Sequence, residues 1–320
     1  MSDAPRRKLP GDIYGGITTA VISLPMALTF GIVSGAGPIA GLYGAIIVGF
    51  FAALVGGTRT LISEPTGPMT VIMTAVVTGT MAADPEQGLA LAFTVVMLAG
   101  LFQIVFGALK LGRYITLMPY SVISGFMSGI GVLLVLTQLA PLLGHPAPPG
   151  GAIGTLQALP SLIAEARLAE LALAGVALAI LFLTPRKVRR FAPPPLIAVI
   201  VGTLIAIAFF SSDEVRTIGR IPMGLPRFVL PRLTVGLATD LVVDALVLAL
   251  LGSIDSLLTA MIADSLTKEH HDSNRELIGQ GVGNMLSGLF GGLPGAGATM
   301  GTVVNIRSGA GTPRAGVIRW

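Results

Sequence analysis

Apolar segments long enough to cross a lipid bilayer follow one another along almost the whole chain. A helix needs about 20 apolar residues to cross a hydrocarbon core of about 30 Å. Backbone polar groups must pair within each segment in lipid, so these segments are expected to be helices. We expect spans at 14–33, 38–55, 66–82, 88–109, 115–142, 168–184, 194–210, 240–263 and 277–292, with a short one from 298. The pattern predicts an all-α polytopic membrane protein with about ten spans.

The composition agrees with a membrane protein and argues against several other classes. Hydrophobic residues make up 53% of the 320 residues and charged residues 11%, which is outside the range of soluble globular domains. The absence of cysteine excludes disulfides, thiolate metal sites and a cysteine nucleophile. No basic patch combines cations with interleaved aromatic residues, so nucleic acid is not an expected partner.

The basic residues predict the orientation of the chain in the membrane. Residues 1–13 are polar and basic and lead directly into a full-length span, so we expect a cytoplasmic amino terminus without a cleavable signal peptide. If the spans alternate, most Lys and Arg residues fall on the same side as this segment. The exceptions lie in the longer loop 213–238 and are Arg216, Arg220, Arg227 and Arg232.

An internal repeat places Gly/Pro-rich interruptions at two matching positions. In the first copy "GFFAALVGG" runs into "TRTLISEPTGPMTV", and in the second "GNMLSGLFGG" runs into "LPGAGATMGTVV". With alternating spans, the first copy starts from the inside and the second from the outside. This pattern indicates an inverted-topology repeat, in which paired interrupted segments point to the binding site of a transporter.

The interrupted segments predict an anion site. Non-helical backbone at membrane depth is tolerated only where it is buried in protein or lines a wet cavity. Thr66 and Gly67 are expected to leave free N–H groups at the start of one half-helix, and Ala298 and Thr299 at the start of the other. Two converging helix N-termini favour an anion. The alternative is that Thr66 and Thr299 are ordinary helix caps.

Asp255 lies deep within the apolar segment 240–263. A carboxylate in the bilayer is costly and is by default functional. Ser256 is adjacent, and Thr259, four residues on, lies on the same helix face. Carboxylate, hydroxyl and carbonyl oxygens suit a hard cation such as Na⁺. A bound Na⁺ would balance the anion and couple the two binding events. The alternative is a carboxylate that only hydrogen-bonds a neighbouring helix.

Glu64 is expected to have a structural role near the inner rim, paired with Arg59; an anion-pathway or proton site is the alternative. Residues 159–170 have helical spacing and are interpreted as an interfacial helix or as an extension of the sixth span.

Two apparent motifs are better explained by helix packing and by a polar loop than by a ligand site. "GQGVGN" (279–284) resembles a nucleotide-binding loop only superficially, and on a membrane helix its small residues indicate close packing. His270 and His271 lack the spacing of a helical metal pair, so they are interpreted as part of a polar loop.

Four stretches together resemble the SulP anion transporters (solute carrier family 26), and in particular the cyanobacterial sodium-dependent bicarbonate transporters of that family. They are "DIYGGITTAVISLPMALTFGIVSGAGPIAGLYGAI", "ISEPTGPMTVIMTAVV", "LLGSIDSLLTAMIAD" and "GGLPGAGATMGTVVNIRSG". The resemblance spans essentially the whole chain. It implies an inverted 7+7 transmembrane repeat, with two half-helices preceded by short extended stretches, in which a core domain moves against a gate domain in an elevator-like step.

The resemblance also implies site residues and domains. The residues expected to contact bicarbonate are Thr66, Ala298 and Thr299, to which the helix-end argument adds Gly67. The residues expected to hold Na⁺ are Asp255, Thr259, Gly297 and Thr299.

The expected domains are a cytoplasmic segment (1–13), core spans 1–4 with the first gate span (14–142), gate spans (143–212), an extracellular loop (213–238) and core spans 8–10 (239–320). Family members continue with four more spans and usually a regulatory STAS domain, so we expect the fold to be incomplete here.

These observations predict a secondary active anion transporter of the inner (plasma) membrane rather than an enzyme. Na⁺-coupled bicarbonate symport is the first expectation, in a protein that is a homodimer in the full-length family. A proton-coupled dicarboxylate or sulfate transporter of the same fold and a non-transporting truncated remnant are the alternatives. An intramembrane aspartyl protease would need two facing aspartates, and only Asp255 lies deep in a span.

Overall fold

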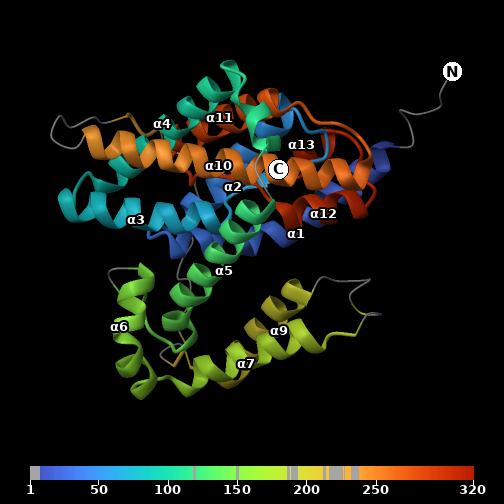
Figure 1. Cartoon of the computed structure of the whole chain (residues 1–320). Coiled ribbons are helices and arrows are strands. Elements are labelled where there is room, and N and C mark those ends of the chain that lie inside the picture. Colours follow the sequence, from blue (N-terminus) through green and yellow to red (C-terminus); the bar gives the residue numbers. More distant parts are fainter. Residues whose placement is uncertain are drawn as a thin grey trace. The chain divides into compact units, whose positions relative to one another are not determined.

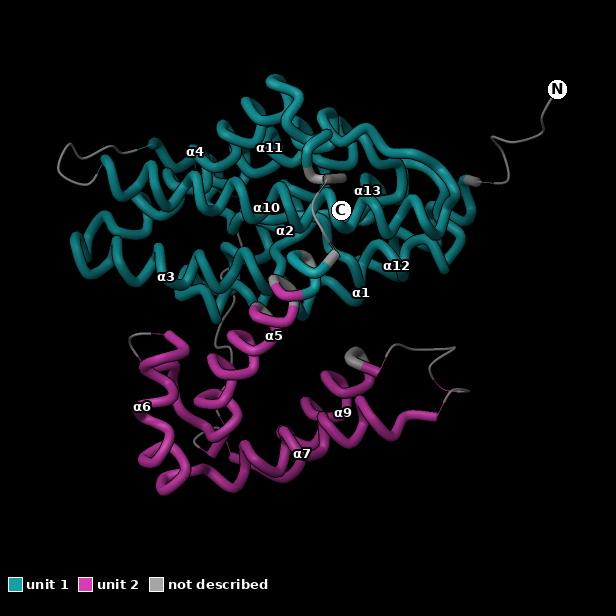
Figure 2. The backbone as a smooth tube through the Cα atoms, in the orientation of Figure 1, with its two compact units in different colours: residues 1–124, 222–320 teal, residues 125–221 magenta. Residues whose placement is uncertain are grey.

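The computed structural model describes residues 8–117, 120–148, 151–185, 188, 194–211, 214–215, 226, 228–231 and 238–320, and these are mostly helical (Figure 1). The chain forms two compact units (Figure 2). The first comprises Met1–Ser124 and Pro222–Trp320, and the second comprises Gly125–Ile221. The first unit therefore joins the two halves of the internal repeat, which are far apart in the sequence.

The first unit contains helices from both ends of the sequence and two very short strands. Its elements are α1 (Lys8–Val33), α2 (Pro38–Val55), β1 (Ser63–Glu64), α3 (Gly67–Ala83), α4 (Gly88–Ala108), a 3-10 helix η1 (Leu111–Leu117), α10 (Ala238–Thr267), α11 (Ser273–Leu289), β2 (Ala296–Gly297), α12 (Thr299–Arg307) and α13 (Arg314–Ile318). Helix α5 (Tyr120–Leu142) begins in this unit and continues into the second.

Four helices of the described chain are long and apolar enough to cross a membrane: α1, α2, α4 and α10. Helix α2 has the expected bounds because Pro38 occupies its first turn and Gly56 follows its last residue. Helix α1 starts earlier than the expected span, at Lys8, and α11 starts earlier at Ser273. The early start of α11 has a local cause, because the Asp272 side chain accepts hydrogen bonds from the N–H groups of Asn274 and Arg275.

Small residues let α11 pack tightly against α2 and α4, as expected for 279–284. A Cβ atom added to Gly281 would lie 2.5 Å from the carbonyl oxygen of Gly100, and one added to Gly279 would lie 2.6 Å from the Cα of Gly56. No side chain fits at such distances. The interpretation of this segment as a close-packing helix is confirmed.

The second unit contains the rest of α5 with α6 (Gly151–Ala164), α7 (Leu168–Leu183) and α9 (Pro194–Phe209). Helices α6 and α7 meet at an angle of 112°. The interpretation of 159–170 as a simple extension of the sixth span is therefore wrong. The break is held by the N–H of Arg167, which donates to the carbonyl of Leu143 at 3.1 Å, so a distant part of the chain stabilises the bend.

Candidate functional site

The two Gly/Pro-rich interruptions meet as an antiparallel pair of strands inside the first unit. Ser63 pairs with Gly297 and Glu64 with Ala296, and both stretches are buried. Helix α3 follows β1, and α12 follows β2. The two half-helices preceded by short extended stretches are thus confirmed, and their starts are brought together by backbone pairing.

Neither half-helix has a side chain capping its start. Thr66 occupies the N-cap position of α3 with extended backbone angles but makes no side-chain capping bond, and the N-cap of α12 is Ala298. The alternative of an ordinary threonine cap is therefore wrong for Thr66. Thr299 lies in the first turn of α12 rather than at its cap. The expectation of a free N–H at Ala298 is wrong, because this group donates to the Ile62 carbonyl at 2.8 Å as part of the strand pairing. The N–H groups that follow it in α12, and those at the start of α3, have no side-chain cap among the described residues.

The hydroxyl of Thr66 donates instead to Asp255 Oδ2 at 2.9 Å. Asp255 lies on α10 and its side chain belongs to the buried interior, with 5% of the residue exposed. The contact joins the start of α3 to the middle of α10. The predicted anion residue Thr66 and the predicted cation residue Asp255 are therefore direct neighbours.

The other predicted residues come together one turn further along α10. Thr259 Oγ1 donates to the carbonyl oxygen of Gly297 at 2.8 Å and lies 2.9 Å from Thr299 Oγ1. Ser256 Oγ accepts a hydrogen bond from the Gly297 N–H at 3.0 Å. Helix α10 thus hydrogen-bonds both the N–H and the C=O of Gly297 in the second extended stretch, shortly before α12 begins.

The oxygen atoms in this region are of the kind that coordinates a hard cation. The hydroxyls of Thr259 and Thr299 and the carbonyl of Gly297 are in mutual contact. The Asp255 carboxylate lies one turn earlier on α10, where it accepts from Thr66, so all four groups offer oxygens. Oxygen donors of this kind suit Na⁺ better than a transition metal, which favours imidazole or thiolate. The start of α12 lies beside the same atoms, so a cation and an anion would be neighbours.

Glu64 does not pair with Arg59. Its carboxylate forms an ion pair with Arg319, both side chains being buried, while Arg59 lies 3.8 Å from Glu269 on the exposed turn after α2. The strand pairing of β1 buries Glu64, and α13 brings Arg319 to it. Because Arg319 is 255 positions away in the sequence, local spacing could not identify this partner.

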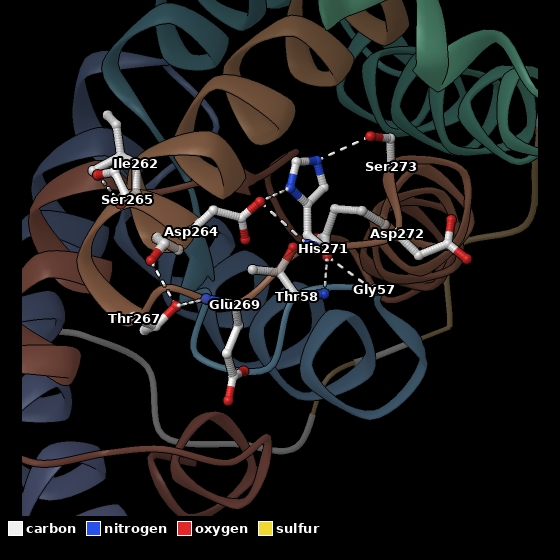
Figure 3. A network of polar contacts seen from close by, with 12 residues as sticks. Gly57, Thr58, Ile262, Asp264, Ser265, Thr267, Glu269, His271, Asp272 and Ser273 are labelled. Carbon is white, nitrogen blue, oxygen red and sulfur yellow. Dashed lines mark hydrogen bonds and ion pairs between the residues drawn. The ribbon is translucent and has the colours of Figure 1, made fainter.

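A second polar cluster lies at the end of α10 and in the loop before α11 (Figure 3). His271 Nδ1 lies 2.7 Å from Asp264 Oδ2, and its Nε2 lies 2.9 Å from Ser273 Oγ. The cluster borders a cavity of about 300 Å³ that also contacts Gly57, Thr58 and Arg59. His271 is thus part of a polar loop network, as expected, and orders the connection between the two helices.

Sequence reasoning missed the polar residues of α11. Glu276, Gln280 and Asn284 are buried and hydrogen-bond β1 and the segments that lead into β1 and β2. Their spacing of four residues within an otherwise apolar or small-residue helix was the available signal. The glycines between them indicate close helix packing, and only this packing was predicted.

Residues 9–320 match the model of the Sulfate permease family. The chain is 61% identical to the "Bicarbonate transporter BicA" of Synechocystis sp. over 98% of its own length and 56% of that protein. It is 58% identical to the protein of the same name from Picosynechococcus sp., again over 98% and 56%. The chain therefore spans about half the length of these curated relatives.

Solved structures agree with the sequence comparisons. The transmembrane domain of a cyanobacterial bicarbonate transporter BicA matches with a TM-score of 0.93 at 61% identity, covering 98% of this chain and 80% of that one. The murine Solute Carrier 26 family member A9 anion transporter, in its inward-facing state, shares the fold with a TM-score of 0.85 at 20% identity, over 100% of this chain and 56% of that one. The resemblance to the SulP anion transporters is confirmed: this chain is a multi-pass membrane protein of the Sulfate permease family.

Proposed function

We propose that this chain carries the binding site of a secondary active transporter that moves bicarbonate together with Na⁺. The observation that supports the proposal most directly is the meeting of two uncapped half-helix starts beside Asp255. Helix N-termini favour an anion, and a buried carboxylate favours a cation. A site with both features suits a pair of ions of opposite charge.

The anion would bind at the starts of α3 and α12, where Thr66, Gly67, Ala298 and Thr299 lie. The hydroxyls of Thr66 and Thr299 and the N–H groups in the first turn of each helix are the donors that a small oxyanion would accept from, whereas the Ala298 N–H already donates to Ile62 and Ala298 would only line the site. Bicarbonate is proposed because the relatives at 61% and 58% identity are named bicarbonate transporters.

The Na⁺ ion would be held by the oxygens of Asp255, Thr259, Gly297 and Thr299. It would supply a positive charge beside the anion and neutralise the buried carboxylate. The protein's own contribution is to hold these oxygens together, through the hydrogen bonds of Thr259 to Gly297 and Thr299. If Asp255 Oδ2 were to bind the cation, the Thr66 hydroxyl that donates to it in this structure would be available to the anion.

We further propose that transport follows an elevator-type alternating-access mechanism in the inner membrane, with the amino terminus in the cytoplasm and a homodimer as the working state. The arrangement of basic residues supports the orientation. The inverted pair of interrupted helices supports alternating access.

A second candidate is a proton-coupled sulfate or dicarboxylate carrier. One observation favours it: the relative YvdB of Bacillus subtilis, 36% identical over 98% of this chain, is named a putative sulfate transporter. Uptake that is independent of sodium and steeply dependent on pH would select this candidate.

Uptake of labelled bicarbonate tests the first candidate. Cells that express the chain are assayed with external Na⁺ or with choline in its place. We expect Na⁺-dependent uptake that falls at least about tenfold in Asp255→Asn, since the variant removes the charge that attracts the cation.

Asp240→Asn is the matched control. It makes the same change on the same helix at an exposed position in the first turn, and we expect wild-type uptake from it. Equal uptake in Na⁺ and in choline would contradict sodium coupling, and no uptake under any condition would contradict transport by this chain.

A further inference from the structure

Helix α11 carries a stripe of polar residues on one face: Glu276, Gln280, Asn284 and Ser287. Steps of four, four and three residues keep them on the same side of the helix. Each is at most 1% exposed. Burying four polar side chains in a row is costly unless each is hydrogen-bonded, so their partners define what this face does.

The first half of the stripe holds the segment that leads into β1. The carboxylate of Glu276 accepts hydrogen bonds from the N–H groups of Gly57 at 3.0 Å and Thr58 at 2.8 Å. Gln280 Nε2 donates to Ser63 Oγ at 2.6 Å and to Glu276 Oε1 at 2.8 Å. Helix α11 therefore fixes, by hydrogen bonds, both β1 and the segment that leads into it.

The second half of the stripe holds the segment that leads into β2. Asn284 Oδ1 accepts from the Gly295 N–H at 2.7 Å, and Asn284 Nδ2 donates to the Gly295 carbonyl at 2.9 Å. Ser287 Oγ donates to the Leu293 carbonyl at 2.7 Å. The amide of Asn284 thus satisfies both backbone groups of the residue that directly precedes β2, as a neighbouring strand would.

Gln103 on α4 is a further hydrogen-bond partner of the Asn284 amide. Its Oε1 accepts the remaining Nδ2 hydrogen of Asn284 at 2.8 Å, and both side chains are fully buried. A rotated Asn284 amide would set its oxygen against the Gly295 carbonyl, so the backbone groups of Gly295 define its orientation. The pair therefore holds Gly295 in one register.

Gly295 itself has no room to shift toward β1. A Cβ atom on Gly295 would lie 2.9 Å from the carbonyl carbon of Glu64. Two residues later, Gly297 is held by Ser256 and Thr259 of α10. The second extended stretch is thus fixed between α11 on one side and β1 and α10 on the other.

We propose that Asn284 is a positioning residue for the ion pair: by fixing Gly295 it places the Gly297 carbonyl and the start of α12 where cation and anion bind. The inference rests on the proposed function of that site. It assigns to α11 a part in ion affinity although none of its side chains contacts the proposed ions.

The test compares Asn284→Ala, Gln103→Leu and the control Asn274→Ala. Asn274 lies on the same helix and its side chain accepts from the Gly112 N–H, away from both half-sites. The half-saturating Na⁺ and bicarbonate concentrations are measured by ligand-induced thermal stabilisation of the purified protein in detergent. Hydrogen exchange of the peptide 290–300 is followed by mass spectrometry.

We expect Asn284→Ala to raise the half-saturating Na⁺ concentration at least about tenfold and to speed exchange in 290–300. Its unfolding temperature without ligand should also fall, because the buried backbone groups of Gly295 lose their partner. Gln103→Leu should produce a smaller shift of about twofold to fivefold, and Asn274→Ala less than twofold. A merely structural role would lower the unfolding temperature without changing ion affinity.

Unchanged half-saturating concentrations in a folded Asn284→Ala protein would overturn the inference. If that variant does not fold, Gln103→Leu decides in its place, and wild-type affinity there would overturn it equally. Failure of the proposed function gives a different result, since the wild-type protein would then show no stabilisation by Na⁺ or bicarbonate.

Discussion

At the scale of single residues, the site depends on oxygens that belong to distant parts of the chain. Thr259 is the central one, because its hydroxyl contacts both the Gly297 carbonyl and the Thr299 hydroxyl and is fully buried. It therefore joins α10 to the start of α12. Removing this hydroxyl leaves the buried Gly297 carbonyl and the half-buried Thr299 hydroxyl without this partner, which costs more than the bond itself is worth.

Thr259→Val tests this reading, since valine has nearly the same shape and lacks the hydroxyl. We expect the half-saturating Na⁺ concentration to rise about tenfold, which corresponds to about 1.4 kcal/mol of lost binding free energy. Thermal stabilisation by Na⁺ in detergent gives the measurement.

Thr80→Val is the control for that substitution. The Thr80 hydroxyl is also buried, but it bonds only carbonyls of its own helix, those of Val76 and Val77. We expect wild-type Na⁺ affinity from it. A Thr259→Val protein with wild-type Na⁺ affinity would remove this residue from the cation site.

Which residues could be found from the sequence depended on whether their signal was local. Asp255 stood out because a carboxylate in an apolar span is rare, and Thr259 followed from helix geometry. The partner of Glu64 could not be found, because Arg319 reaches it only through the packing of α13. The role of Asn284 could not be predicted from the sequence, because it depends on the contact with Gly295 in the folded chain.

At the scale of elements, α11 packs closely against α2 and α4 and hydrogen-bonds the segments that carry β1 and β2. Helix boundaries were predictable where proline and glycine mark them, as at Pro38 and Gly56 of α2. The bend between α6 and α7 was not, since it depends on a contact between Arg167 and Leu143. Local signals thus defined the ends of helices, while tertiary contacts defined their angles.

Gly281→Ala tests the close packing of α11. The added methyl group would lie 2.5 Å from the Gly100 carbonyl oxygen and 2.7 Å from the backbone nitrogen of Ile104, so backbone atoms would have to move. Overpacking of this kind costs about 1–3 kcal/mol. We expect a lower unfolding temperature in detergent, together with weaker binding of Na⁺.

Gly175→Ala on α7 is the matched control, because among the described residues no atom outside its own helix backbone lies within 4 Å of the added Cβ. Alanine in a helix is more stable than glycine by about 0.5–1 kcal/mol, so this variant should unfold at the wild-type temperature or slightly above it. If Gly281→Ala is as stable as Gly175→Ala, α11 does not pack as tightly as the structure indicates.

At the scale of the whole molecule, the first unit assembles one site from two interrupted segments that are more than 200 residues apart. The inverted repeat predicted this meeting from sequence, because matching interruptions in a repeat of opposite orientation converge. We propose that the two segments together bind one cation and one anion, each favouring the other. Such coupling must be reciprocal: the factor by which bicarbonate strengthens Na⁺ binding equals the factor by which Na⁺ strengthens bicarbonate binding.

The most direct test of this claim is the pair of binding constants measured with and without the other ion, on the purified chain in detergent. We predict that saturating bicarbonate tightens Na⁺ binding at least about fivefold, that Na⁺ tightens bicarbonate binding by the same factor, and that Asp255→Asn abolishes both effects. Binding of either ion that is independent of the other, or coupling that survives in Asp255→Asn, would contradict the account.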